Sequence, residues 1–285
     1  ILKQFLYPEF INGLDVFEKS KLELIKDKKV GLVINHTSMN KMQNHIIDIC
    51  VENEINVSVI FAPEHGFKGK LSAGEKFGDS IESKTKAKIV SLYGKNRIPK
   101  SSDMIGLDLI IYDIQDIGAR YYTYISTLTN MMKICAENDI PMIVIDRPNP
   151  VNGITVSGNV LDRKFSSFVG MHPIPIRHGM TTGELAYMIN NEWLSDNLKA
   201  DLSIIKMKNW SRNQYYDEFI ENWNPPSPNI PDLETAINYI GACLFEGTNI
   251  SEGRGTEFPF MQFGAPFINS EILLHEINQK DFKGI

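Results

Sequence analysis

The sequence lacks the features of several common protein classes. Its longest apolar stretches, Leu107–Ile114 and Met142–Ile145, fall far short of the roughly 18 residues that a membrane-spanning helix needs. Cysteine is scarce: the three cysteines among 285 residues, Cys50, Cys135 and Cys243, form no CxxC pair and lack the spacing of metal ligands. We therefore expect no membrane span and three buried thiols.

An excess of positive charge is also missing. Lysine and arginine number 29 against 35 aspartates and glutamates, which gives a net charge of -6. Such a chain has no general field to hold phosphate backbones, so nucleic acid is not expected as a partner. Hydrophobic residues make up 42% and charged residues 22%. These values are typical of soluble globular chains and argue against disorder, collagen or a coiled coil.

Several catalytic and cofactor motifs are absent. No GxGxxG follows the first predicted strand, and no GxxxxGK[ST] phosphate loop occurs, which disfavours nucleotide chemistry. A serine hydrolase of the common type would carry a GxSxG elbow after a strand, and none is present. HExxH and HxH spacings are missing as well. We expect no cofactor and no metal.

The first half of the chain alternates short β-rich runs with helical patterns, which favours an α/β fold with a parallel sheet and crossover helices. The runs are nearly all apolar, as expected for strands that are covered on both faces. They lie at Lys29–Asn35, Val57–Pro63, Ile89–Gly94, Leu107–Ile114 and Pro141–Arg147. Residues 1–150 are thus predicted to form a Rossmann-like domain, with Tyr122–Asn138 as a covering helix.

After Pro150 the rhythm changes to fewer strands and more loops, and prolines cluster between residues 225 and 231. We expect a second, smaller α/β domain over residues 151–285. Thr181 and Glu184 have the spacing of a capping box that opens a helix. A further helix is predicted over Leu233–Phe245 from the apolar stripe on one of its faces.

Polar and ionisable residues follow every predicted strand. Because open α/β sheets bind ligands beyond the carboxyl ends of their strands, these residues mark the expected site. They include Asn35, His36, Glu64, His65, Asp113, Gln115, Asp116, Arg120, Tyr121, Asp146 and Arg147. Carboxylates, histidines, amides and arginines in one place indicate acid–base chemistry on a polar substrate. Glycine-flanked loops around Arg177-His178 and at Glu246–Thr256 are expected to form the opposite wall of a cleft.

Six phrases of the sequence resemble the signatures of one family, the exo-β-N-acetylmuramidase (NamZ) family, long catalogued as a domain of unknown function. The resemblance extends from about Gly13 to Phe267. Its phrases are Phe61–Gly66 (FAPEHG), Asp113–Tyr124 (DIQDIGARYYTY), Asp146–Pro150 (DRPNP), Pro175–Thr181 (PIRHGMT), Pro226–Pro231 (PSPNIP) and Glu246–Thr256 (EGTNISEGRGT).

The resemblance implies a bacterial enzyme of cell-wall turnover that removes N-acetylmuramic acid from the non-reducing end of peptidoglycan glycan fragments. It also implies a Rossmann-like domain and a second domain that bounds the cleft. Family chains continue well beyond the last residue of this one, so the second domain is expected to be partial. Because the substrate is built in the envelope, we expect a periplasmic or secreted protein, although Ile1–Phe10 shows no export signal.

Glycoside hydrolysis usually needs a protonated carboxylic acid at the leaving oxygen and a second carboxylate. Glu64 is the expected acid, because it stands at a strand end beside His65 and because the resemblance implies a catalytic role for it. For the second carboxylate, Asp113 and Glu246 are candidates, as are Asp116 and Glu252. The stereochemical outcome stays open, and the acetamido group of the substrate is an alternative nucleophile.

The lactyl carboxylate of muramic acid calls for a guanidinium that can bind it with two hydrogen bonds. The candidates are Arg120, Arg147, Arg177 and Arg254, and for each the alternative is a structural ion pair. The remaining residues expected at the substrate are Asn35, Gln115, Tyr121, His178, Asn249 and Glu252.

Two other functions fit the same residues. One is a non-catalytic protein that binds muropeptides or glycans. The other is a metal-dependent amidase or deacetylase of cell-wall glycans, in which His36, His65 and His178 would hold a metal together with Glu64 or Asp113.

Overall fold

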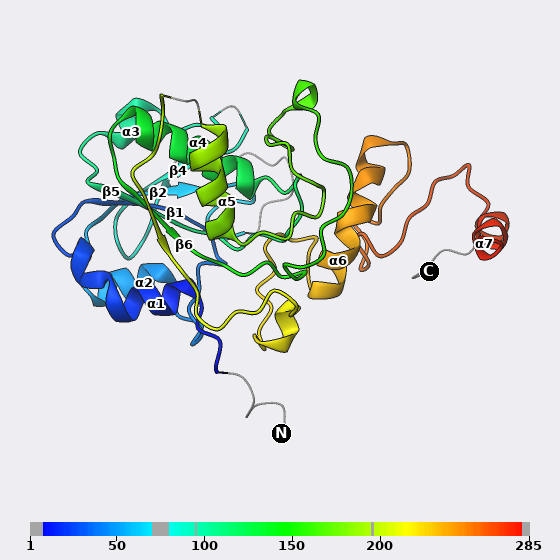
Figure 1. The fold of residues 1–285 in the computed structure, drawn as a ribbon, viewed down its shortest axis with the longest axis horizontal. Helices are drawn as coiled ribbons and strands as arrows, with labels where there is room; N and C mark the ends of the chain where they lie inside the picture. Colours follow the sequence, from blue (N-terminus) through cyan, green and yellow to red (C-terminus); the bar gives the residue numbers. More distant parts are fainter. Residues whose placement is uncertain (1–7, 70–79, 95, 195–196, 281–285) are drawn as a thin grey trace. The chain divides into compact units, whose positions relative to one another are not determined.

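A computed structural model of the chain describes residues 8–69, 80–94, 96–194 and 197–280 (Figure 1). The chain divides into two compact units, Ile1–Leu233 and Glu234–Ile285. The division at residue 150 that the sequence suggests stays a prediction about domains.

The first unit is built on a mostly parallel sheet. In the described residues its strands are β1 (Val30–Ile34), β2 (Val57–Ala62), β3 (Ser80–Ile81), β4 (Lys88–Ser91), β5 (Leu109–Asp113), β6 (Met142–Ile145) and β7 (Leu202–Ile205). They lie in the order β3-β4-β2-β1-β5-β6-β7, and only the β3–β4 pair is antiparallel. The predicted α/β class with a parallel sheet is therefore confirmed.

The strand order also places the site. Numbered along the chain, the six parallel strands lie in the order 3-2-1-4-5-6, which is the order of the Rossmann fold. The order reverses between β1 and β5, whose residues Ile34 and Asp113 are register partners at the carboxyl end. Ligands of such sheets bind in the crevice at this reversal. The loops after β1 and β5 are thus the first place to look for function.

Helices of the first unit cover both faces of the sheet. Their bounds are α1 (Gly13–Ser20), α2 (Ile46–Glu52), α3 (Ser101–Met104), α4 (Tyr124–Glu137) and α5 (Thr182–Met188). Two further helices are α6 (Leu233–Ala242), which begins at the last residue of the first unit, and α7 (Ser270–Asn278) of the second unit. Short turns of other helix types lie at Leu22–Ile25, Arg163–Phe165, Ile189–Trp193, Tyr216–Glu218 and Cys243–Gly247. Figure 1 shows α1 and α2 on one face of the sheet and α3, α4 and α5 on the other.

The core forms because each central strand is apolar on both faces. Leu14 and Phe17 of α1 and Ile46 of α2 pack in one cluster with Leu32 and Ile60 of the strands, all fully buried. α4 covers the opposite face of the sheet, and its Met131 and Met132 side chains are fully buried. Burial on both faces explains the continuous apolar runs from which the strands were predicted.

The sequence located five of the seven strands that the structure describes and missed two. Each of the five predicted strands has an observed counterpart, and the predicted helix at Tyr122–Asn138 is α4. β3 was missed because both of its residues are exposed, and β7 because it alternates in burial instead of forming an apolar run. The capping box of Thr181 and Glu184 is confirmed at the start of α5.

Two sequence predictions need correction or refinement. Cys50 and Cys135 are buried, but Cys243 is only partly buried, because it lies in the turn that follows α6. The helix predicted to reach Phe245 ends at Ala242 and tightens there into a 3-10 turn.

Burial raises the pKa of the Cys50 and Cys135 thiols to about 12. Within the described ranges, no helix is long and apolar enough to cross a membrane.

Candidate active site

The carboxyl ends of β1, β2, β5 and β6 carry the polar loops of the first unit, which we call the rim. The rim consists of residues 35–38, 63–66, 114–121 and 146–150. Most of its polar side chains are buried, including Asn35, Glu64, Gln115, Asp116 and Arg147. Buried polar groups need partners, so the hydrogen bonds of the rim show which groups are fixed and which are free to act.

Glu64 is presented by a tight turn at the end of β2. The amide of Gly66 donates to the carbonyl of Pro63 over 3.0 Å, which closes a four-residue turn. His65, the third residue of this turn, has φ +68°. Residues other than glycine seldom adopt this left-handed conformation, and when they do, the position is often functional. The turn therefore holds Glu64 in place through a locally unfavourable backbone.

Within the described part of the chain, the carboxylate of Glu64 is held by a hydrogen bond at one of its two oxygens. Its Oε2 atom accepts a hydrogen bond from the Thr123 hydroxyl over 2.7 Å. Oε1 accepts none from any residue that the structure describes. The whole residue is 8% exposed. A carboxyl group with one anchored and one free oxygen in a mostly buried place is suited to transfer a proton.

Asn35 and Tyr124 tie the start of α4 to the rim. The Tyr124 hydroxyl donates to the carbonyl of Pro226 over 2.7 Å and accepts from Asn35 Nδ2 over 3.0 Å. Asn35 Oδ1 in turn accepts from the amide and the hydroxyl of Thr37, at 2.9 and 2.6 Å. Asn35, a predicted substrate ligand, is fully buried and uses these atoms to fix the loop beside Glu64.

Asp113 and Arg147 form a buried ion pair across β5 and β6. Arg147 Nε donates to Asp113 Oδ1 over 2.6 Å and Nη2 donates to Oδ2 over 2.7 Å. Nη1 donates to the carbonyl of Met39 over 2.8 Å. Burial acts to lower the pKa of Arg147, but the Asp113 carboxylate outweighs it and the pKa is raised. The sequence offered two roles for Arg147, substrate binding and a structural ion pair, and the structure shows the ion pair.

The loop after β5 brings Gln115, Asp116 and His178 together. Gln115 Nε2 donates to the carbonyls of Asp116 and Pro148, at 2.7 and 2.8 Å. Asp116 Oδ2 accepts from the amide of Gly118 over 2.8 Å, whereas Oδ1 is buried without a partner among the described residues.

The His178 ring faces this aspartate. Its Nε2 atom lies 3.4 Å from Asp116 Oδ2, although the alignment is too poor for a hydrogen bond. Nδ1 accepts from the amide of Met180 over 3.1 Å, so a neutral His178 carries its proton on Nε2. Asp116 on the rim and His178 beside it therefore each have a buried polar atom without a partner among the described residues, which a bound ligand can satisfy.

Arg120 and Arg177 bind backbone carbonyls and lie in no salt bridge with the described residues. Arg120 Nη1 donates to the carbonyl of Ile174 over 2.6 Å and to that of Asn159. Burial lowers the pKa of Arg120. Arg177 Nη2 donates to the carbonyl of Val151, and its Nε is buried without a partner in the part of the chain that is described. Both arginines thus keep a positive charge that no described carboxylate neutralises.

The second unit holds the other predicted residues, Glu246, Asn249, Glu252 and Arg254. Arg254 Nη2 donates to Glu246 Oε1 over 2.5 Å, and its Nε lies 3.2 Å from Glu252 Oε1. Burial acts to lower the pKa of Arg254, but the hydrogen bond and charge of Glu246 outweigh it, and the pKa is raised. Asn249 is exposed and Glu252 is buried. Of the two roles that the sequence offered for Arg254, substrate binding and a structural ion pair, the structure again shows the ion pair.

The structure thus groups the predicted residues into sets. Glu64, His65, Asn35, Gln115, Arg120, Tyr121 and Arg147 lie on the rim, and Asp113 is the last residue of β5. Arg177 and His178 lie on a loop that is joined to the rim by the pairing of Ala119 with Arg177. Sequence reasoning missed Thr123 as a partner of Glu64, although Thr123 lies inside one of the six family phrases. No group of three or more metal-ligating side chains is found among the described residues.

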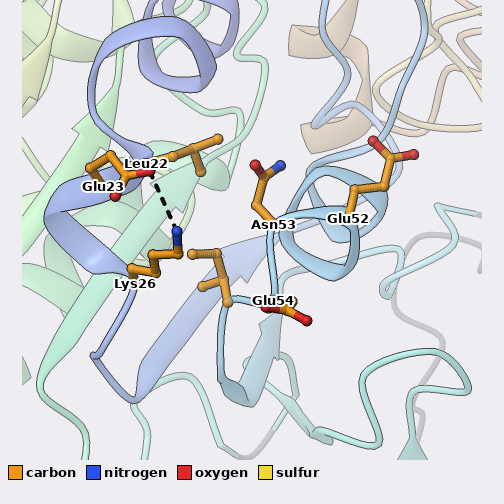
Figure 2. Close-up of a pocket in the computed structure, with 7 residues that line it drawn as sticks. Leu22, Glu23, Lys26, Glu52, Asn53 and Glu54 are labelled. Atoms are coloured by element: carbon orange, nitrogen blue, oxygen red, sulfur yellow. Dashed lines mark ion pairs between the residues drawn. The ribbon is translucent and has the colours of Figure 1, made fainter.

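A pocket of about 230 Å³ lies at the other end of the sheet (Figure 2). It is lined by residues that precede β1 and β2, namely Leu22, Glu23, Lys26, Glu52, Asn53, Glu54 and Ile55. Figure 2 shows the ion pair of Lys26 with Glu23, whose atoms are 3.6 Å apart. Open α/β sheets bind ligands at the carboxyl ends of their strands, so this pocket is on the wrong edge for the main site.

Comparison with known sequences identifies two family matches that together span most of the chain. Residues 30–234 match "Exo-beta-N-acetylmuramidase NamZ, N-terminal", and residues 237–285 match "Exo-beta-N-acetylmuramidase NamZ, C-terminal". The chain is 41% identical over 279 residues to "Peptidoglycan beta-N-acetylmuramidase NamZ" of Bacillus subtilis (strain 168). That alignment covers 98% of this chain and 67% of the relative.

Two solved structures of DUF1343 family proteins from Bacteroides fragilis NCTC 9343 are also similar. The first has a TM-score of 0.86 at 36% sequence identity, and the alignment covers 95% of this chain and 69% of the chain in that structure. The other has a TM-score of 0.80 at 41% identity and covers 92% of this chain and 69% of its own.

Proposed function

Because the chain belongs to the exo-β-N-acetylmuramidase NamZ family, we propose that it is a glycosidase that releases N-acetylmuramic acid from the non-reducing ends of peptidoglycan fragments. Glu64 is the general acid of this reaction. The observation that carries the assignment is the geometry of its carboxyl group at the carboxyl end of β2, with one oxygen bound by Thr123 and the other accepting no hydrogen bond from the described residues. No cofactor enters the proposed reaction.

The chemistry requires a proton at the leaving oxygen and a second group at the anomeric carbon. Glu64 supplies the proton. For the second group, the hydrogen bonds support Asp116 more than Asp113, because both oxygens of Asp113 accept from Arg147, whereas Asp116 Oδ1 has no partner in the described structure. Glu246 and Glu252 stay candidates on the second unit.

The lactyl carboxylate distinguishes muramic acid from N-acetylglucosamine, so selectivity for muramic acid requires an arginine that binds this carboxylate. Arg147 and Arg254 already pair with carboxylates of the protein. Among the described residues, Arg120 and Arg177 donate hydrogen bonds to neutral carbonyls and form no salt bridge, which supports them as the arginines that bind the substrate. Because peptidoglycan is built in the envelope, we further propose that the protein acts in the periplasm or outside the cell.

The test compares the wild-type chain with Glu64→Gln on para-nitrophenyl N-acetyl-β-muraminide and on a disaccharide of N-acetylmuramic acid linked to N-acetylglucosamine. General acid catalysis contributes about 10²- to 10⁴-fold. On the disaccharide we expect kcat to fall by a factor in this range, with binding preserved because glutamine nearly keeps the shape.

Two results would contradict parts of the proposal. A Glu64→Gln variant that keeps kcat on the disaccharide within about tenfold of wild type would remove Glu64 as the acid. A wild-type chain that binds both substrates in calorimetry but hydrolyses neither would indicate the non-catalytic glycan-binding alternative.

A further inference from the structure

Thr123 occupies the N-cap of α4 without acting as a cap. A threonine at this position usually accepts a hydrogen bond from a backbone amide in the first turn of the helix. Thr181 at the start of α5 does so: it has ψ 167°, and its hydroxyl accepts from the amide of Glu184 over 3.2 Å. Thr123 has φ -69° and ψ -9°, and its side chain makes no cap hydrogen bond. Its hydroxyl points instead to Glu64 Oε2.

We propose that Thr123 is a positioning residue for Glu64: its hydroxyl holds Oε2 and thereby leaves Oε1 to carry the proton that is transferred. The inference rests on the proposed function, in which Glu64 is the general acid. It goes beyond that function because it assigns separate roles to the two carboxyl oxygens and names the side chain that separates them.

The assignment of the proton follows from the direction of the hydrogen bond. An ionised Glu64 carboxylate can only accept hydrogen bonds, so Thr123 Oγ1 donates to Oε2 across 2.7 Å. In the proposed arrangement this direction is kept when the carboxyl group is protonated, so the proton sits on Oε1. In the reaction this proton passes from Oε1 to the leaving oxygen, while the bond from that oxygen to the anomeric carbon breaks and its electron pair stays on the oxygen. The glutamate left behind is negative, and the bond from Thr123 stabilises that charge.

Both ends of this hydrogen bond are fixed to the protein. On one side, the turn closed by Pro63 and Gly66 sets the backbone of Glu64. On the other, the carbonyl of Tyr124 accepts from the Tyr112 hydroxyl over 3.0 Å, and the Tyr124 hydroxyl is bound to Pro226 and Asn35. A donor and an acceptor that are both held in this way confine the carboxyl plane, which is what a precise proton donor requires.

The experiment uses the full chain with Thr123→Val, which removes the hydroxyl at similar volume, and Thr123→Ser, which keeps it. Thr127→Val on the same helix is the matched control, because among the described residues the Thr127 hydroxyl donates only to the carbonyl of Thr123, over 3.3 Å. Each variant is assayed on the muramic acid–glucosamine disaccharide and on a dinitrophenyl muraminide. The glycosidic oxygen of N-acetylglucosamine leaves only when it is protonated to a hydroxyl, whereas dinitrophenolate leaves readily without a proton.

A lost hydrogen bond to a charged group predicts that Thr123→Val lowers kcat on the disaccharide by about 10- to 100-fold. We expect a change of less than about threefold on the dinitrophenyl substrate and in the disaccharide KM. Thr123→Ser should restore most of the activity, and Thr127→Val should behave like wild type on both substrates.

Other results would overturn the inference. Equal losses on the two substrates would show that Thr123 only maintains structure, and a disaccharide kcat within about twofold of wild type would show that it has no role. If Thr123→Val fails to fold, Thr123→Ala replaces it and the comparison of the two leaving groups is unchanged. A further arm adds Thr123→Val to Glu64→Gln, where an additional loss would also contradict the inference. A wild-type chain inactive on both substrates would refute the proposed function itself, a result distinct from these.

Discussion

The Asp113–Arg147 pair offers the sharpest test of whether a rim residue is structural. Both side chains are buried, at 0% and 6% exposed, and two hydrogen bonds of 2.6 and 2.7 Å join them. Breaking a buried ion pair by removing one partner costs about 3–5 kcal/mol, because the other charge stays buried and unpaired. Arg147→Met keeps the length of the side chain and leaves Asp113 in that state.

The expected loss is measurable by thermal unfolding. In a domain of this size, 1 kcal/mol shifts Tm by about 2–4 °C, so Arg147→Met should lower Tm by about 6–20 °C. The double variant Asp113→Leu/Arg147→Met removes both charges. Since replacing both partners with apolar residues is often neutral, it should unfold above the single variant. The carbonyl of Met39 loses its donor in both variants, so the difference between them isolates the unpaired carboxylate.

The reasoning would be refuted if Arg147→Met kept the Tm of wild type and lost activity only on muramic substrates. That result would mean that Asp113 is readily rehydrated or neutralised, and that Arg147 reads the lactyl carboxylate. A double variant less stable than the single one would refute the argument in another way, because it would show that the net interaction of the pair, and not the unpaired charge, sets the stability.

Two further predictions concern single side chains. Arg177→Ala should lower kcat/KM on a muraminide about 10- to 100-fold more than on the matching glucosaminide, and equal losses on the two would remove Arg177 from the lactyl site. Burial raises the pKa of Asp146 from 3.8 to about 6. A raised pKa in the folded state means that this carboxyl group contributes stability below about pH 4 that is lost as the pH rises through 6. In Asp146→Asn the side-chain oxygen still accepts from the amide of Gly183. In urea unfolding, the free energy of unfolding of this variant should therefore rise by roughly 3 kcal/mol relative to that of wild type as the pH is raised from 4 to 7. A difference that does not depend on pH would contradict this.

The sequence was sufficient for features that depend on local pattern. The apolar runs predicted β1, β2, β4, β5 and β6, because strands buried on both faces have little freedom in composition. The spacing of Thr181 and Glu184 predicted a cap, because both partners lie within one turn of a helix. The position of Glu64 at a strand end also followed from this pattern.

Contacts between distant residues were beyond its reach. Thr123 and Glu64 are 59 residues apart, and no local spacing connects them. For Arg147 the sequence left an ion pair and substrate binding equally open, because the choice depends on Asp113, which is 34 residues away. A short or partly exposed edge strand such as β7 carries too weak a pattern, since its pairing with β6 and not its composition makes it a strand.

The hydrogen bonds that secure the rim have a consequence for the order in which the protein assembles. Tyr124 reaches Asn35 across 89 residues and Pro226 across 102, and His36 Nε2 lies 2.6 Å from the carbonyl of Pro225, 189 residues away. Contacts between such distant parts of a chain form slowly, because closing the intervening loops is entropically unfavourable. The sheet can therefore complete its inner strands first, whereas the loops around the acid carboxylate of Glu64 are fixed only when the segment at Pro225 and Pro226, about 160 residues further along the chain, has docked. Catalytic competence is then one of the last properties that the folding chain acquires.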